Sequence, residues 1–287
     1  MLIYLDNSAT TKVRDEVLKE IIDANENFYG NPSSLHRMGL VVEKKIDEAR
    51  KTSAKLIGAK PEETYFTGGG TESNNIAIFG HLTNLNKHNS VITTKIEHPS
   101  VYNVFKHIED KCQVKYLDTD ENGRINTQEL YDMVDENTLL VSIIHVNNEI
   151  GTVQQLNEIA STIKRKNENA RLHVDAVQSY GKIKIDVHKV PVDTLTFSSH
   201  KIHGPKGVGG LYIRSGLKIA PLIYGGGQES GIRSGTENTT GIIGFGKACE
   251  LVYDSFNEET NKLYSLKDTY VKKLEEEIED IKINSPA

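Results

Sequence analysis

The chain has 287 residues, of which 37% are hydrophobic and 26% charged, and its formal net charge is −6. This length is enough for a sizeable core and for one large domain with a smaller unit. The acidic balance, without a basic block, argues against nucleic acid and anionic membranes as partners. No stretch approaches the roughly 20 apolar residues of a membrane span, and no signal-peptide pattern opens the chain. Two widely separated cysteines favour a reducing compartment, so we expect a cytoplasmic protein.

Helical and strand patterns alternate along the chain. We predict helices at 13–24, 36–57, from Thr71 onward, and at 99–108, 127–134 and 156–166, then from about 242 and at 258–281. Strands are expected at 64–67, 91–94, 114–117, 139–146, 172–174, 194–197 and 210–213. Strands that alternate with helices indicate an α/β fold with a mostly parallel central sheet and helices on both faces.

The most informative residue is Lys201, which follows the strand pattern at 194–197 and precedes the turn Pro205-Lys206-Gly207. A lysine usually lies on a solvated surface, and the local pattern here favours a functional lysine and a surface lysine about equally. A lysine held between a strand and a Gly/Pro loop, beside Ser198 and His200, suits an amine that attacks a carbonyl group. Such lysines form Schiff bases with substrates or with pyridoxal phosphate (PLP).

A PLP site also needs an acid beside the pyridine nitrogen. The segment 171–178 supplies an apolar strand that ends in Asp175. In open α/β sheets the carboxyl ends of strands border the ligand site, and a carboxylate there would keep the pyridine nitrogen protonated. For an isolated aspartate, a helix N-cap would be the simpler interpretation.

The candidate phosphate cradle is the turn Gly68-Gly69-Gly70, which leads into the helix expected from Thr71. Glycines let the backbone approach an anion closely, and a helix N-terminus offers free N–H groups. The turn has neither the Walker A pattern nor the Rossmann spacing. A glycine-rich turn alone is weak evidence, but a turn followed along the chain by Asp175 and then Lys201 is strong evidence for PLP.

With these motifs in place, the chain resembles the cysteine desulfurases, PLP enzymes of fold-type I in the class V aminotransferase superfamily. The resemblance runs along the whole chain, and the motif set is highly specific. The segments that carry it are Tyr4–Thr11, Gly30–His36, Thr67–Asn75, Glu97–His98, His145–Gly151, His173–Gln178, Ser198–Lys201 and Arg233–Asn238. The resemblance implies removal of sulfur from L-cysteine, which leaves L-alanine.

The resemblance assigns roles to the residues around the cofactor ring. Lys201 matches the lysine that forms the Schiff base with PLP, and Asp175 matches the partner of the pyridine nitrogen. Gln178 matches the residue near the phenolic oxygen of the ring. His98 matches a histidine that stacks on the ring and moves protons, although an isolated histidine before a proline would be a surface residue. Asn148 matches an asparagine beside the cofactor.

Other positions match contacts to the cofactor phosphate. Gly70, Thr71, Ser198 and His200 are those positions within one chain. Thr236 resembles a threonine that reaches the phosphate of the neighbouring subunit, so the resemblance implies a homodimer with shared sites. It also implies transfer of sulfur to an acceptor or scaffold protein, for iron–sulfur clusters or modified nucleosides.

The family uses a nucleophilic cysteine that becomes a persulfide, on a mobile loop of the C-terminal segment. This sequence ends shortly after the helix expected at 258–281, before such a loop or the arginine that follows it. Its two cysteines, Cys112 and Cys249, lie in a strand-like and a helical pattern. We expect both to be buried and inert, because reactive thiols need exposed, electropositive surroundings. We therefore expect a chain that is inactive in sulfur transfer on its own.

The expected organisation is a large PLP-binding domain at 1–257, with residues 1–25 packing near a small domain. Residues 258–287 would form a linking helix and the start of that small, incomplete domain, which leaves part of the helix's apolar stripe bare. Two other functions stay open. The chain could be another PLP lyase or aminotransferase, such as a selenocysteine lyase, or a non-catalytic dimer partner of a full-length relative.

The segment 118–129 matches the spacing of an EF-hand calcium loop. An EF-hand needs an entering helix, and residues 112–117 alternate like a strand instead. We therefore interpret the segment as a turn between a strand and the helix at 127–134. His200 and His203 lack further ligands with suitable spacing for zinc, so no metal site is predicted.

Overall fold

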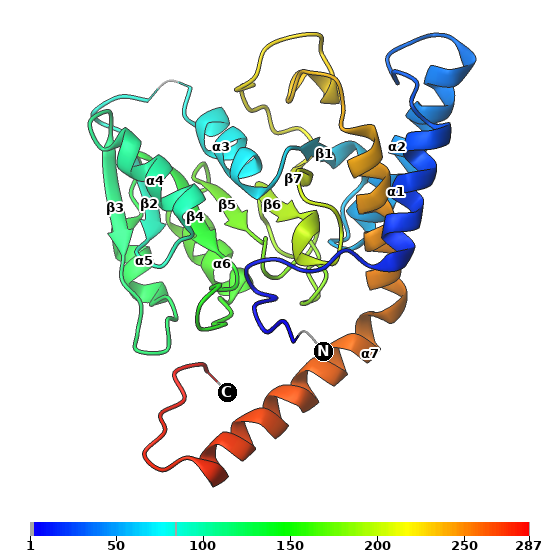
Figure 1. Ribbon diagram of the computed structural model, residues 1–287. Coiled ribbons are helices and arrows are strands. Elements are labelled where there is room, and N and C mark those ends of the chain that lie inside the picture. The colour runs from blue at the N-terminus through cyan, green and yellow to red at the C-terminus, as the bar shows by residue number, and fades with distance from the viewer. Residues whose placement is uncertain (1–2, 84, 287) are drawn as a thin grey trace.

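A single seven-stranded sheet forms the centre of the protein, in the computed structural model that describes residues 3–83 and 85–286 (Figure 1). The strand order is β1-β7-β6-β5-β4-β2-β3. The strands are β1 (Thr64–Thr67), β2 (Ser90–Thr94), β3 (Gln113–Leu117), β4 (Thr138–Ile144), β5 (Arg171–Asp175), β6 (Thr194–Ser198) and β7 (Gly209–Ile213). Only β7 is antiparallel to its neighbours β1 and β6, and all other pairs are parallel. The predicted mostly parallel α/β sheet is confirmed.

Helices cover both faces of the sheet. They are α1 (Asp15–Asn27), α2 (Arg37–Lys55), α3 (Gly70–His81), α4 (Pro99–Ile108), α5 (Thr127–Met133), α6 (Leu156–Lys166) and α7 (Thr239–Glu277). One apolar cluster joins α3 and α4 to the sheet, and a larger one joins α2, α5, α6 and the first part of α7 to the opposite face. These helices bury the sheet on two sides, as a parallel sheet requires.

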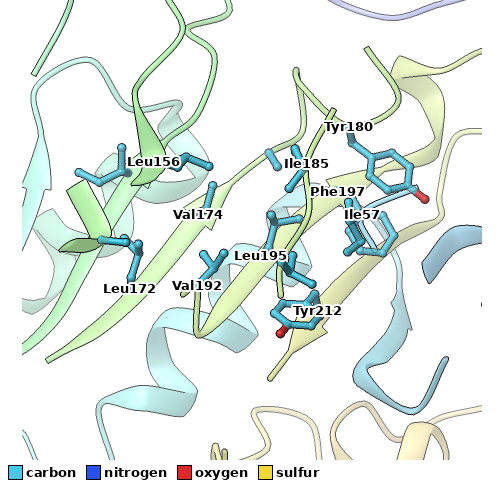
Figure 2. Close-up of a cluster of buried hydrophobic side chains, with 14 of the residues drawn as sticks. Ile57, Leu156, Leu172, Val174, Tyr180, Ile185, Val192, Leu195, Phe197 and Tyr212 are labelled. Atoms are coloured by element: carbon cyan, nitrogen blue, oxygen red, sulfur yellow. The ribbon is translucent and has the colours of Figure 1, made fainter. Parts of the chain in front are cut away.

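Successive residues of the strands point into different cores. On β2, Val91 belongs to the α3–α4 cluster and Ile92 to the cluster on the other face. The close-up in Figure 2 shows the larger cluster, where Tyr180 stacks on Phe197 with ring centroids 4.4 Å apart. This two-sided burial explains why the strands read as continuous apolar runs rather than as alternating ones.

Helix α7 differs from its sequence prediction. We expected one helix from about 242 and a second at 258–281, but the structure has one continuous helix of 39 residues. Neither glycine nor proline occurs after Gly246 within it, so no backbone feature interrupts it. Its second half extends away from the rest of the molecule (Figure 1). The predicted domain division after residue 257 falls inside this helix and stays a prediction.

The apolar stripe on the second half of α7 is partly bare, as predicted. Leu263, Leu266 and Tyr270 are 56%, 55% and 66% exposed. Among residues 3–83 and 85–286, none of the helices has both the length and the apolar character to cross a membrane.

Strand β3 leads into the segment that resembles an EF-hand, so the entering helix of an EF-hand is replaced by a strand. Asp120 accepts hydrogen bonds from the backbone N–H groups of Asn122 and Arg124, and Gly123 has φ 74°. The aspartate therefore closes a turn, and the predicted strand–turn–helix arrangement is confirmed.

The contact between α2 and α7 allows a test of the packing. A Cβ atom on Gly246 would lie 2.6 Å from Cβ and 2.7 Å from Cα of Ala49, so α7 approaches α2 through this glycine. We expect Gly246→Leu to lower the free energy of unfolding by about 1–3 kcal/mol through overpacking, measured by urea denaturation. The control is Glu250→Leu, one turn later at an exposed position, which should cost less than about 1 kcal/mol. Equal losses for the two variants would contradict this packing.

Candidate active site

The residues with chemical interest follow the carboxyl ends of strands at one edge of the sheet. Strands β2, β4, β5 and β6 point the same way, and β1 does so too because both β1 and β6 oppose β7. A cavity of about 420 Å³ opens at this edge. It is lined by Asp6, Ser8, Ala9, Gly70, Thr71, His98, Ser100, Ile144, Asn148, Glu149, Asp175, Val177, Gln178, Ser198, His200 and Lys201. Open α/β sheets bind ligands at such an edge.

Lys201 lies in a short 3-10 turn, Ser199–Lys201, directly after β6. Only 9% of it is exposed, and its Nζ donates hydrogen bonds to the backbone carbonyls of Ser8 and Ala9. Burial lowers the pKa of the amine, while the negative charges of Asp175 and Asp6 oppose that shift. A lowered pKa increases the fraction of neutral amine, which is the form that attacks a carbonyl carbon.

Asp175 ends β5 and is 3% exposed. Its Oδ1 accepts a hydrogen bond from the backbone N–H of Val177 and its Oδ2 from Nδ2 of Asn74, each at 2.9 Å. Burial raises the pKa of this carboxyl, and the two hydrogen bonds oppose the rise, as do His98 and Lys201. The side chain caps a local turn but also faces the cavity, so it is more than a helix cap. A buried carboxylate of this kind favours a cationic ligand group beside it.

The cavity also has the features of an anion cradle. Helix α3 begins at Gly70, and none of the side chains that the structure describes caps its N-terminus. A Cβ atom on Gly70 would lie 2.8 Å from Cγ2 of Val177, so only glycine allows this close approach. Within the described chain, the buried Oγ of Ser198 has no hydrogen-bond partner. Together with Thr71, these groups form the donor set that a phosphate needs.

The structure brings four further predicted residues to the same cavity, His98, Asn148, Gln178 and His200. The ring of His98 caps the start of α4, where its Nδ1 accepts the backbone N–H of Ser100 at 3.1 Å. Gln178 donates from Nε2 to the carbonyl of Ser8 at 2.8 Å, and Asn148 donates to Glu149 Oε1 at 2.6 Å.

Comparison with known proteins settles the family. Residues 3–287 match the family Aminotransferase class-V. The chain belongs to the class-V aminotransferases. It is 42% identical over 286 residues to a cysteine desulfurase IscS of Clostridium botulinum. The matched residues make up 99% of this chain and 72% of that protein. It is 43% identical over 288 residues to a cysteine desulfurase IscS of Dictyoglomus turgidum, with the same coverage. Within its family the chain is therefore a cysteine desulfurase homologue, and the cofactor of these enzymes is PLP.

Solved structures agree with this placement. A NifS-like protein superposes with a TM-score of 0.92 at 42% identity, covering 96% of this chain and 76% of its own. A structure described as SspA in complex with cysteine gives a TM-score of 0.83 at 39% identity, covering 87% and 72%. The fold-type I architecture predicted from the motifs is confirmed.

Thr236 lies apart from the other predicted residues of this class-V aminotransferase. It lines a second cavity of about 100 Å³ with Phe66, Gly68 and Gly207, among others, and Lys201 is not part of that lining. A role for Thr236 at the Lys201 cavity of its own chain therefore has no geometric support.

Sequence reasoning missed the N-terminal segment as a part of the site. Asp6, Ser8 and Ala9 line the main cavity, and Thr10 Oγ1 lies 3.0 Å from Nδ1 of His200. Short polar residues outside a helix or strand show no periodicity, so the only available signal was the family motif at Tyr4–Thr11.

Both cysteines are buried, as predicted, at 4% exposure for Cys112 and 0% for Cys249. Burial raises the pKa of the Cys112 thiol and raises that of Cys249 to about 12. Cys249 lies 3.2 Å from the hydroxyl of Tyr180, inside the core rather than near the cavity. Neither thiol has the exposure or the ionisation of a nucleophile.

Proposed function

We propose that this chain holds PLP at Lys201 and acts in the removal of sulfur from L-cysteine. The observation that carries the proposal is the convergence of three groups on one cavity. These are a buried amine at Lys201, a buried carboxylate at Asp175 and the hydroxyl of Ser198, which has no partner among residues 3–83 and 85–286 and lies beside the start of α3. They match, in turn, the aldehyde, the pyridine nitrogen and the phosphate of the cofactor.

When bound, PLP supplies an aldehyde that condenses with amines and a pyridine ring that accepts electrons from the substrate. In this proposal Lys201 holds the cofactor covalently and Asp175 keeps its ring nitrogen protonated, since the adjacent opposite charge favours the cation. Gly70, Thr71, Ser198 and His200 would bind the phosphate.

The remaining residues would orient the substrate and move protons. Lys201 and His98 both line the cavity, and each can take up a proton and return it there. Gln178 and Asn148 offer side-chain amides that would bond to the phenolic oxygen and the neighbouring edge of the ring. The site excludes part of the solvent, because the segment with Ser8 and Ala9 contacts Nζ of Lys201.

Sulfur transfer needs a thiolate that attacks the substrate sulfur. Cys112 and Cys249 are buried, and burial raises the pKa of each, so we propose that neither is that thiolate. The nucleophile would therefore come from outside these 287 residues. The chain spans 72% of the length of the IscS relatives. We further propose a cytoplasmic role that supplies sulfur to an acceptor or scaffold protein for iron–sulfur clusters.

The first prediction concerns the covalent bond. PLP added to the purified chain should give a visible absorbance that borohydride abolishes, with the reduced cofactor found on the peptide of Lys201 by mass spectrometry. Lys201→Ala should lose this labelling, because no other buried amine lines the cavity within the described chain. Lys218→Ala, an exposed control outside the site, should label like the parent. Labelling of another lysine in the parent chain would refute the assignment.

The second prediction concerns turnover. L-cysteine should change the spectrum of the PLP-loaded chain, but the chain alone should show no catalytic release of alanine or sulfide, because its thiols are inaccessible. A double variant, Cys112→Ala with Cys249→Ala, should behave like the parent chain. Continuous release of alanine and sulfide, lost in the double variant, would show that a buried cysteine is the nucleophile.

We also propose a homodimer that shares its sites, with Thr236 completing the partner's cavity. An exposed apolar surface supports it, formed by Leu18, Ile22, Tyr29, Leu35, Met38 and Leu40 of α1, α2 and their connection. These residues are 43–94% exposed, and large apolar residues that are exposed in a monomer are typical of interfaces.

Sedimentation should therefore show a dimer, and Leu35→Asp should shift it towards monomer, because a charge would be buried without a partner. Leu266→Asp, at an exposed leucine of α7, is the matched control and should leave the dimer intact. A monomeric parent chain, or equal effects of both substitutions, would count against this interface.

A further inference from the structure

Behind Asp175, away from the cavity, lies a line of buried polar side chains that the proposed function does not use. It comprises Asn74 on α3, His173 on β5, Thr194 on β6 and His81 at the end of α3. Asn74, His173 and Thr194 are 0% exposed. Burying a polar group lowers stability unless the group is hydrogen-bonded, so a connected set of such groups beside a site residue calls for an explanation.

Asn74 is the branch point. Its Nδ2 lies 2.9 Å from Oδ2 of Asp175 and 2.9 Å from Oγ of Ser100, and its Oδ1 lies 3.1 Å from Nε2 of His173. The opposite amide orientation would point Oδ1 at the carboxylate of Asp175, with two acceptors facing each other. Asn74 therefore donates one proton to Asp175 and the other to Ser100, and it accepts from His173.

This orientation fixes the tautomer of His173. Burial lowers its pKa to about 3, although the Thr194 backbone opposes the shift, so the ring is neutral at pH 7. A neutral imidazole has one N–H, and Asn74 Oδ1 requires it on Nε2. The other tautomer would set two lone pairs against each other at 3.1 Å. Nδ1 is then an acceptor, 2.9 Å from Oγ1 of Thr194.

The line continues in one direction. The single hydroxyl proton of Thr194 goes to His173, so Thr194 must accept from Nε2 of His81, 3.2 Å away. Burial lowers the pKa of His81 to about 4, which leaves that ring neutral too. The hydrogen bonds therefore all run in one direction. His81 donates to Thr194, Thr194 to His173, His173 to Asn74 and Asn74 to Asp175.

The second branch reaches His98. Ser100 Oγ accepts from Asn74 and lies 2.8 Å from Nδ1 of His98. The backbone N–H of Ser100 donates to the same nitrogen. Nδ1 of His98 is thus an acceptor, and a neutral ring carries its proton on Nε2.

We propose that Asn74, locked by His173 and Thr194, is the positioning residue that sets both Asp175 as an ionised acceptor and His98 as the Nε2–H tautomer. The groups on the two sides of the cofactor site are thereby oriented by one buried amide. This inference rests on the proposed PLP site only for its consequence in cofactor binding, because the hydrogen-bond directions concern this chain alone.

The first test needs no cofactor. In protein labelled with ¹⁵N-histidine, long-range ¹H–¹⁵N spectra at pH 7 should show His173 as the neutral Nε2–H tautomer, assigned by the loss of its signals in His173→Gln. A charged ring or an Nδ1–H tautomer would overturn the proposal. If the tautomer is as expected but the parent chain binds no PLP, the proposed function fails and the hydrogen-bond assignment stands.

The second test separates positioning from stability. Asn74→Asp keeps the shape but sets a carboxylate against Asp175, so the two acids must share a proton. We expect the dissociation constant of PLP to rise about tenfold, whereas that of the 1-deaza analogue, which has no ring nitrogen, should change less than about twofold. An equal loss for both ligands would indicate a purely structural role. No loss for either would also reject the proposal.

A matched pair on β6 keeps the proposal testable if Asn74→Asp does not fold. Thr194→Val removes the donor to His173. Two residues further along β6, Thr196→Val removes a buried hydroxyl that has no hydrogen-bond partner within the described chain. Thr194→Val should mix the His173 tautomers and weaken PLP about threefold relative to its deaza analogue. Thr196→Val should match the parent in both readouts. Identical behaviour of the two variants would contradict the series of bonds.

Discussion

The buried carboxylate of Asp175 is the constraint around which the site is built. A carboxylate that is 3% exposed is unfavourable unless donors or a cation compensate for its lost hydration. Val177 and Asn74 each donate one hydrogen bond, and Lys201 contributes a nearby positive charge. These contacts reduce the cost of burial only in part, because burial still raises the pKa of Asp175. A protonated pyridine ring is the kind of ligand that would remove the remainder.

The sheet explains why these groups meet. Asp175 ends β5, and Lys201 lies three residues beyond the end of β6, its parallel neighbour. Gly70 follows β1, which runs parallel to β6 because both strands are antiparallel to β7. Residues that are more than 100 positions apart in the chain therefore share one edge. Apolar residues pack on both faces of the strands and hold that edge in place, and Figure 2 shows the larger of the two clusters.

The strands, and most of the residues that line the main cavity, could be singled out from the sequence because each carries a strong local signal. The strand at 64–67 and the helices at 99–108 and 156–166 have the predicted bounds, since apolar runs and a helix-starting proline mark them. The length of α7 could not be predicted. The apolar pattern is weak in the middle of this helix and suggests that two helices meet there, but the helix is continuous. The role of Asn74 was also hidden. It lies in the family motif Thr67–Asn75, but the direction of its amide depends on Asp175, 101 residues away.

The N-terminal segment shows how a chain without regular structure can complete a site. Thr11 donates its backbone N–H and its hydroxyl to the carbonyl of His200, so the segment is fixed beside the turn that holds Lys201. The carbonyls of Ser8 and Ala9 then accept two N–H groups from the lysine. Once the ammonium group has lost a proton, two protons and one lone pair remain, so the two carbonyls would bind both protons and leave the lone pair free. Burial, which lowers the pKa of Lys201, favours the same neutral form. In the proposed function the segment would therefore orient the amine for attack on a carbonyl group, and it would do so through backbone atoms that a substitution of side chains would not remove.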